Sequence, residues 1–286
     1  MALISVIIPT HNRNTLLQRA IASVESQTVR DVDVWVVNDG GVEPAVRESI
    51  QLVSKCHGGP GSARNAGIAA SDSRYIAYLD DDDEWRPHHL ESMLNTLDSS
   101  CLMAYAAADV VDAGRHIRVW GDCAFDKFIA DSFFTIFPPS ACMHRRDLLD
   151  RCGLFDESPL LIGPEDCEFI IRASDFCAPV TTRKRSVVMH RDHSMTRGPR
   201  AEWVDTLAYV IAKNGYTDRR HNWLMLYRAY TAAVREARTK EIGVWGADLD
   251  RVLPSGATRS GEEITGDIRI TPQGINAFCR ERLALA

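Results

Sequence analysis

Short, almost uniformly apolar runs recur in the first eighty residues and constrain the fold more than any other feature. They are Leu3–Ile8, Val32–Val37 and Tyr75–Leu79. Runs of this length without polar alternation are typical of strands buried on both faces of a parallel sheet. Segments with helical periodicity lie between them, so the sequence predicts successive β-α-β units.

Helical periodicity is clearest directly after the first run. In residues 14–27 the apolar side chains that share one helical face are Leu17, Ala20, Ile21 and Val24. Ser62–Ala70 is typical of a second, short helix, and Pro87 fits the first position of a third. We therefore expect an α/β, Rossmann-like fold with a mixed, mostly parallel sheet flanked by helices.

The pattern changes after about residue 100. The elements expected there are two strands within residues 103–120 joined by a turn at 112–115, a helix over Arg145–Arg151, a helix that begins at Pro164 and a strand over Arg185–His190. Beyond residue 200, apolar spacing predicts helices in 204–215 and 222–240, whereas 245–286 carries no clear pattern. We expect one domain over residues 1–200 and a mainly helical C-terminal extension over residues 201–286.

Composition narrows the classes of function. The 286 residues carry 33 basic and 39 acidic side chains, and this net charge of −6 argues against a nucleic-acid partner. The eight cysteines form no CxxC pair, so we expect mostly buried thiols in a reducing compartment. The N-terminus lacks the basic start of a signal peptide, and no run approaches the ~18 apolar residues of a transmembrane helix. We expect a cytoplasmic protein, with peripheral membrane contact left open.

Polar segments follow all three predicted strands, at Pro9–Arg13, Asn38–Gly41 and Asp80–Glu84. Ligands of open α/β sheets bind beyond the carboxyl ends of the strands, so we expect these segments to form one crevice. Four consecutive aspartates repel one another, and a hard cation such as Mg²⁺ or Mn²⁺ would neutralise them. The alternative is a solvated loop whose carboxylates cap the helix at Pro87.

A glycine-rich segment, HGGPGSARNAG, occupies residues 57–67. Its glycines allow a phosphate to approach the backbone closely, and Arg64 offers that phosphate a bidentate contact. The segment matches neither a Walker A loop nor a GxGxxG pattern, and an ordinary turn is the alternative interpretation.

Taken in order, five segments resemble the family-2 inverting glycosyltransferases with the GT-A fold. They read SVIIPTHNR, VVNDGG, GPGSARNAG, YIAYLDDDDEW and FDESPLLIGPEDCEF. The resemblance covers residues 3–200 and implies a nucleotide-sugar-binding half, 1–100, and an acceptor and catalytic-base half, 101–200. VVNDGG departs from the commoner VVDDGS, because Asn38 replaces an acid while Asp39 is kept.

The resemblance also implies roles for individual residues. Pro9, Thr10 and Asn12 would lie along the nucleoside, Arg13 near the diphosphate, Asp39 on the nucleobase, and Arg64 beside the diphosphate and the acidic loop. Asp80, Asp81 and Asp82 would form the DxD element, with Asp80 nearer the ribose or sugar and Asp82 on the metal. Glu165 would bind the acceptor or donor sugar, and Asp166 would be the catalytic base.

The local sequence gives a physical argument for Asp166. Pro164 fits the first position of a helix, which puts Glu165 and Asp166 in its first turn, where the helix dipole favours an ionised carboxylate. A general base must be ionised before it takes a proton from a hydroxyl. The alternative is that the two acids only stabilise the start of the helix.

Two histidines and three tryptophans are further candidates. In the family a histidine at the place of His190 often binds the metal or the diphosphate, and we prefer it to His193, with a surface histidine as the alternative. Trp85, Trp120 and Trp203 could stack on a sugar. Trp85 is the best placed of them, although core packing is the default for a tryptophan.

The basic run at residues 183–185 is typical of a solvated turn. Attraction to an anionic acceptor or to a lipid surface is the alternative.

The function implied by the resemblance is metal-dependent, inverting transfer of a sugar from a nucleoside-diphosphate donor, UDP favoured, to an acceptor hydroxyl, with Mn²⁺ or Mg²⁺ as cofactor. The donor sugar, the acceptor class and a possible homodimer stay open. One alternative is a sugar-nucleotide-forming nucleotidyltransferase, which usually carries a long basic glycine-rich loop where this chain has PTHNRN. The other is an inactive nucleotide-binding module, against which the DxD element and the Glu165–Asp166 pair argue.

Overall fold

The computed structural model describes residues 2–98, 100–127, 130, 136–191, 206, 209–210, 213, 258–260 and 263–265. The chain forms two compact units, residues 1–130 with 134–199 and residues 131–133 with 200–286. In the second unit, strands β10 (Thr258–Ser260) and β11 (Glu263–Thr265) pair antiparallel. The helical extension predicted for 201–286 lies mostly outside the described residues, as do His193 and Trp203.

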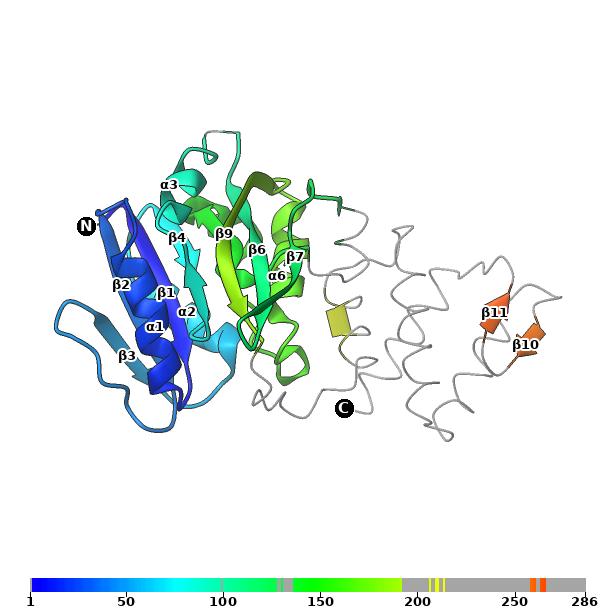
Figure 1. Ribbon diagram of the computed structural model, residues 1–286. Coiled ribbons are helices and arrows are strands. Elements are labelled where there is room, and N and C mark those ends of the chain that lie inside the picture. Colours follow the sequence, from blue (N-terminus) through cyan, green and yellow to red (C-terminus); the bar gives the residue numbers. More distant parts are fainter. Residues whose placement is uncertain are drawn as a thin grey trace. The chain divides into compact units, whose positions relative to one another are not determined.

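Nine strands of the described part of the first unit form one sheet (Figure 1). They are β1 (Ile4–Thr10), β2 (Val32–Asp39), β3 (Gln51–Lys55), β4 (Tyr75–Tyr78), β5 (Asp83–Trp85), β6 (Met103–Asp112), β7 (Arg115–Trp120), β8 (Cys142–Arg145) and β9 (Val180–His190). Their order across the sheet is β3-β2-β1-β4-β8-β6-β9-β5, and β7 pairs with β6. β1 to β4 run parallel, whereas β5, β7 and β8 pair antiparallel with their neighbours. This confirms the predicted α/β, Rossmann-like class.

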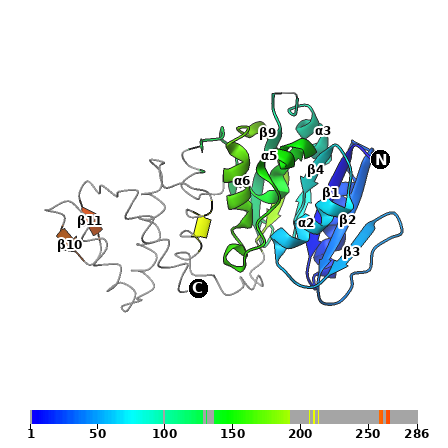
Figure 2. The same cartoon turned by 180° about the vertical axis from the view of Figure 1, so that it is seen from behind.

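Helices cover both faces of the sheet. α1 (Asn14–Glu25) lies on one face in Figure 1, and α2 (Pro60–Ala70), α5 (Leu149–Cys152) and α6 (Glu165–Ser174) lie on the other, which Figure 2 brings to the front. The short helix α3 (His89–Leu94) contacts β6 and β9. Burial of the sheet on both faces is the reason that its strands read as continuous apolar runs.

The helix α2 packs closely against β1. The apolar side chains of β1, Ile4, Val6, Ile7 and Ile8, are fully buried. Gly67 of α2 permits the close approach, because a Cβ atom there would lie 2.6 Å from Ile7 Cγ2. The helix that carries the glycine-rich segment is thereby fixed against the strand that leads into the first polar segment.

Several expected boundaries were wrong. The strands β3, β5 and β8 were not predicted, and β9 begins at Val180 rather than at Arg185. The helix expected over Arg145–Arg151 is a 3₁₀ turn at Arg146–Leu148 followed by α5, and Arg145 itself ends β8. These short strands have little periodicity of their own; β8, for example, is held by β4 on one side and β6 on the other.

Within the described residues, no helix combines the length and the apolar character needed to cross a bilayer. Cys101, Cys142, Cys152 and Cys167 are buried free thiols, as predicted for most of the cysteines. Cys56 and Cys123 are exposed, because they lie in loops beyond strand ends.

Candidate active site

The ends of β1 and β4 converge, as the parallel arrangement predicts. Thr10 Oγ1 donates a hydrogen bond to Asp81 Oδ2 (2.7 Å). Arg13 Nη1 lies 3.2 Å from Asp81 Oδ1 and 3.2 Å from Asp82 Oδ2. Pro9 is buried within β1, opposite Val37. The segment after the first strand therefore contacts the acidic loop, which we define as Asp80–Asp83.

The acidic loop is a tight turn anchored by Ser140. Asp83 N donates to Asp80 O (3.1 Å), which closes the turn. Asp80 N donates to Ser140 Oγ (3.0 Å), and Ser140 Oγ donates to Asp83 Oδ2 (2.5 Å). The loop thus presents Asp81 and Asp82 towards Arg13 while Asp83 is buried beneath it.

Burial and mutual repulsion raise the pKa values of these carboxyl groups. Burial, followed by the charges of Asp80 and Asp81, raises the pKa of Asp82 to about 6 despite the nearby Arg13. Burial also raises the pKa of Asp81, against the opposing effects of Thr10 and Arg13. The pKa of the buried Asp83 lies well above its usual range for the same reasons. The loop is therefore a site that an added cation would stabilise.

The chemistry of this donor set fits a hard divalent cation. Mg²⁺ and Mn²⁺ take oxygen ligands, and one or two carboxylates with waters and substrate phosphates complete their shells. Within the described residues no three histidine, cysteine or acidic side chains are already arranged around a metal position. The guanidinium group of Arg13 lies between Asp81 and Asp82 and supplies the positive charge there.

Arg64 joins the acidic loop to the acidic pair on α6. Its Nη2 donates to Asp80 Oδ1 (2.6 Å), and its Nη1 donates to Glu165 Oε1 (2.7 Å). The side chain is 2% exposed, and its Nε has no hydrogen-bond partner among the residues that the structure describes. Burial lowers the pKa of Arg64, but the two carboxylates outweigh burial and hold it above its usual value. Two acidic segments, about 85 residues apart in the sequence, thus share the buried guanidinium group of Arg64.

Glu165 and Asp166 occupy the first turn of α6, as predicted. Glu165 is buried, and its second carboxylate oxygen accepts from Gly163 N (2.9 Å). Asp166 is partly exposed, and its Oδ1 accepts from Cys167 N (2.7 Å). Glu165 is therefore engaged on both oxygens, whereas Asp166 has an oxygen that a substrate hydroxyl could use.

The surroundings of Asp166 oppose the ionisation that the start of a helix favours. Burial and the adjacent charge of Glu165 raise the pKa of Asp166 to about 7, and Arg64 offsets only part of this increase. The helix dipole is worth at most about 2 kcal/mol and is outweighed here. A carboxyl group with a pKa near neutrality is well matched to proton transfer at physiological pH.

Asp39 anchors the glycine-rich loop. Its Oδ1 accepts from Gly58 N (2.9 Å) and from Lys55 Nζ (3.0 Å), and its Oδ2 accepts from Gly59 N (2.8 Å). His57 Nδ1 lies 2.9 Å from the same Oδ2. The side chain predicted to bind a nucleobase is thus already bonded to the loop ahead of α2.

Asn12 lies on the exposed side of the same region. It has a positive φ of 56°, and its Oδ1 accepts from Val42 N (2.9 Å). The imidazole rings of His11 and His57 have centroids 4.7 Å apart and planes inclined by 42°, and the Nδ1 atom of each lies within hydrogen-bond distance of Asp39 O. The ends of β1 and β2 therefore carry an exposed, partly aromatic surface beside Arg13.

His190 contacts Glu84 rather than Asp82. Its Nε2 lies 2.6 Å from Glu84 Oε1, and Arg19 Nε lies 3.2 Å from the same oxygen. Arg19 Nη2 also donates to the backbone oxygen of Asp82 (2.7 Å). The end of β9 is thereby tied to the acidic loop, although the predicted metal ligand Asp82 and His190 do not contact each other directly.

Trp85, the tryptophan best placed in sequence for a sugar, lies in the core. It is 3% exposed, its Nε1 donates to Ser140 O (2.6 Å) and its ring stacks on His89. Trp85 alternates with Glu84 along β5, so its side chain points to the buried face of the sheet.

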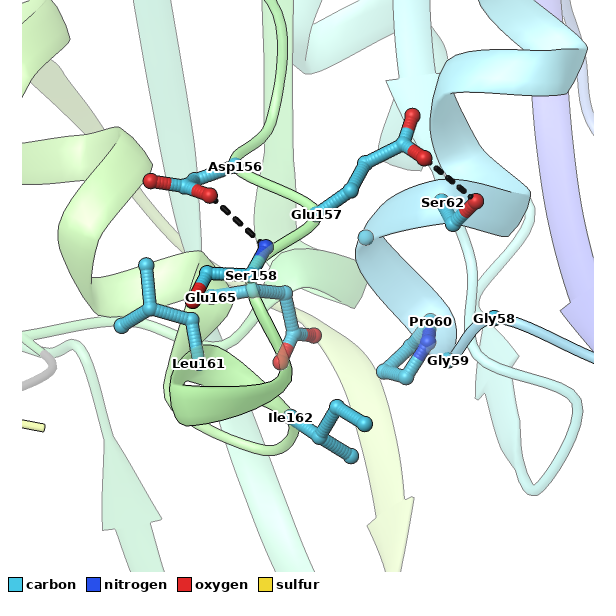
Figure 3. A pocket seen from close by; sticks show the side chains of 11 residues that line it. Gly58, Gly59, Pro60, Ser62, Asp156, Glu157, Ser158, Leu161, Ile162 and Glu165 are labelled. Carbon is cyan, nitrogen blue, oxygen red and sulfur yellow. Dashed lines mark hydrogen bonds between the residues drawn. The ribbon is translucent and has the colours of Figure 1, made fainter. Parts of the chain in front are cut away.

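A small, shallow hollow opens beside Glu165, between the start of α2 and residues 156–162 (Figure 3). Glu157 forms one wall and accepts from Ser62 Oγ (2.8 Å), as the dashed line in Figure 3 indicates. Ile162 forms the outer wall next to Gly59 and is 45% exposed. The hollow combines carboxylates with an exposed aliphatic group next to the predicted base.

Ser140, Arg19 and Lys55 were not recognised from the sequence, and Glu84 was recognised only as the last residue of the segment Asp80–Glu84. Each acts through a contact to a residue more than 15 positions away. No local pattern marks such residues. Of these residues, only Lys55 could have been identified from its position in the sequence, because it lies two residues before the glycine-rich segment.

Comparison with known proteins assigns the class. Residues 5–155, more than half of the chain, match the profile of the family described as Glycosyl transferase family 2. The chain therefore belongs to glycosyl transferase family 2.

Individual relatives agree with this assignment. An uncharacterized glycosyltransferase of Nostoc is 28% identical over 210 residues, which cover 66% of this chain and 65% of that protein. The succinoglycan biosynthesis protein ExoW of Rhizobium meliloti is 36% identical over 120 residues, covering 36% of this chain and 38% of that protein. The matched segments thus span less than two thirds of these relatives.

Among solved structures, TarS of S. aureus, residues 1–349, resembles the chain with a TM-score of 0.61 at 17% identity, covering 84% of this chain and 74% of that one. The complex of the same fragment with UDP-GlcNAc gives a TM-score of 0.62. This likeness confirms the GT-A fold.

Proposed function

We propose that the protein is a metal-dependent, inverting glycosyltransferase that moves a sugar from a nucleoside-diphosphate donor, most simply a UDP-sugar, to an acceptor hydroxyl. Membership of glycosyl transferase family 2 supports the reaction class. Structures of the similar TarS with UDP and with UDP-GlcNAc support the donor class.

One observation carries the proposal: Arg64 binds Asp80 of the acidic loop and Glu165 beside Asp166 at the same time. Sugar transfer needs a group that stabilises the departing diphosphate and a base that activates the acceptor, on opposite sides of one carbon. A single buried arginine that contacts both acidic segments supports placing these two groups in one site.

The donor would lie along the crevice at the ends of β1 and β4. Arg13 is placed to contact a diphosphate once it leaves Asp81 and Asp82, because its side chain is partly exposed. A Mn²⁺ or Mg²⁺ ion bound by Asp82, with His190 as a further predicted ligand, would neutralise charge that develops on the leaving diphosphate. Thr10 holds Asp81 in place for this arrangement.

Asp166 would act on the acceptor. Its carboxylate takes the proton of the acceptor hydroxyl, the acceptor oxygen attacks the anomeric carbon, and the bond to the diphosphate breaks with its electron pair. One displacement from the face opposite the nucleotide inverts the anomeric configuration. The hollow at Glu157 and Ile162 lies next to this base and is the predicted place of the acceptor or transferred sugar (Figure 3).

The rate of donor turnover should fall as the pH drops below about 7. Asp166 is active when deprotonated, and its pKa is raised to about 7, so protonation removes the base in this range. At pH 6 we expect roughly a tenth of the plateau rate. The measurement is UDP release from a UDP-sugar, with water as a surrogate acceptor, between about pH 5 and 9. A rate that is flat down to pH 5 would contradict the role of Asp166.

Nucleotide binding should depend on metal through the acidic loop. We expect calorimetry to find one of UDP, GDP, CDP and dTDP bound in the presence of Mn²⁺, and its affinity to fall at least about tenfold without the ion. Asp82→Ala should remove this dependence, because Asp82 is the predicted ligand. Asp150→Ala, at an exposed aspartate of α5, should leave it unchanged. A folded protein that binds none of the four nucleotides would refute the proposed function.

A further inference from the structure

We propose that an exposed basic surface on β7 and β9 docks the protein on a bilayer that contains anionic lipids. This surface, called the basic face below, consists of Arg115, Arg118, Arg183, Lys184, Arg185 and Arg191, all of them exposed. It lies within the first unit of the chain.

The two basic segments lie on either side of β6. β7 pairs with residues 108–112 of β6 on one side, and β9 pairs with residues 104–111 of β6 on the other. Arg185 Nη2 lies 3.1 Å from Asp122 Oδ2, just beyond the end of β7. The six cations therefore lie along the two edges of residues 105–112 of β6, a stretch about 23 Å long.

A bulge in β9 directs part of the basic face outward. Between Thr181, opposite Tyr105, and Arg185, opposite Ala107, three residues of β9 stand against one residue of β6. Arg183 in this bulge has a φ of 55°, which is unusual for a residue other than glycine. Threonine hydroxyl oxygens at positions 181 and 182 accept from the backbone N–H groups of Arg183 and Lys184, at 3.0 and 3.1 Å. The positive φ of Arg183 is an unfavourable backbone conformation at an exposed basic turn. A bulge of this kind indicates that the turn has a function other than strand pairing.

The charge of the basic face contrasts with that of the molecule. The whole chain has a net charge of −6. In the described part of the structure, Arg183 and Lys184 form no ion pair with an acidic side chain. An acidic protein with one cationic side is held in a single orientation by an anionic surface, since its other sides are repelled.

Apolar groups among the cations favour a bilayer over a soluble polyanion. Ile117, between Arg115 and Arg118, is 49% exposed. The guanidinium group of Arg118 lies 5.4 Å from the ring centre of Trp120. Aliphatic and aromatic side chains flanked by arginine are typical of residues that sit at the boundary of headgroups and acyl chains. A polyphosphate or a nucleic acid would bind the cationic side chains but would not bury the apolar side chain of Ile117.

The test is co-sedimentation of the full chain with vesicles of phosphatidylcholine alone, or with about one third phosphatidylglycerol. We expect binding only to the anionic vesicles, and much weaker binding at about 300 mM than at about 50 mM salt. Arg183→Glu with Lys184→Glu should lower the affinity at least about tenfold, and Arg115→Glu with Arg118→Glu should act likewise. Arg30→Glu with Arg151→Glu changes the charge equally at exposed sites outside the basic face and should leave binding within about threefold.

Other outcomes would overturn the proposal. They are no sedimentation with anionic vesicles, equal binding to neutral vesicles, or an equal loss in the control variant. Ile117→Ser should weaken vesicle binding without changing retention on heparin. Retention on heparin without vesicle binding would identify a soluble polyanion as the partner instead. Far-UV circular dichroism of each variant checks that the fold is kept, so the result does not depend on enzymatic activity.

Discussion

The substitution Asp166→Asn should lower the rate of sugar transfer about 10³-fold, because it removes the group that accepts the proton of the acceptor. Nucleotide affinity should stay within about threefold, since the acidic loop is unchanged and asparagine keeps the shape of the aspartate side chain. UDP release from the donor and calorimetry of UDP binding measure the two quantities. The separation of the two effects distinguishes a base from a donor-binding residue.

The stability of this variant gives an independent check. The pKa of Asp166 is raised in the folded protein, so folding favours its neutral form and ionisation at higher pH costs stability. Asparagine resembles the neutral form, and at pH 8 we expect a Tm equal to or above that of the original protein. Asp72→Asn, at an exposed aspartate beyond α2, should change neither rate nor Tm. Residual activity above a tenth of the original would show that another group is the base.

Replacing Arg64 by methionine should disable the site and destabilise the fold together. Methionine keeps much of the volume but leaves Asp80 and Glu165 without their shared cation. Loss of one partner from a buried ion pair costs about 3 to 5 kcal/mol. Transfer should fall at least about 100-fold, because the acidic loop and α6 lose the contact that sets their separation.

Two comparisons separate the buried bridge from a general effect of charge. Arg47 also binds a carboxylate, Glu25, at 2.7 Å, but its side chain is 70% exposed. Arg47→Met should therefore cost less than about 1 kcal/mol in chemical denaturation. In the Arg64→Met background, Glu165→Gln should recover part of the lost stability, because it removes an unpaired buried charge. Equal costs for Arg64→Met and Arg47→Met would refute the bridging role.

The sequence predicted the parts of the site that depend on neighbours along the chain. The buried runs of β1, β2 and β4 and the polar segments after them follow from local pattern alone. Pro164 was expected to be the first helical residue and is instead the N-cap of α6, while the expected place of Glu165 and Asp166 in the first turn is confirmed. Parallel strands end at the same edge, so the meeting of Thr10 and Asp81 was also predictable once those runs were identified as strands.

Other features depended on contacts between distant segments. The placement of Trp85 in the core, the contact of His190 with Glu84 and the anchoring of the loop by Ser140 join residues 55 to 106 positions apart. The strand β8 formed for the same reason, since its four residues carry little pattern and are held by β4 and β6.

By itself, the sequence determined the fold class, the order of the polar segments and the identity of the acidic groups, because periodicity, chain direction and side-chain chemistry are local properties. The tertiary structure alone decided which of those groups share a cation, which are buried and where the pKa of Asp166 lies. Desolvation and charge interactions depend on distance in space, and in this protein they outweigh the local effect of the helix dipole at Asp166.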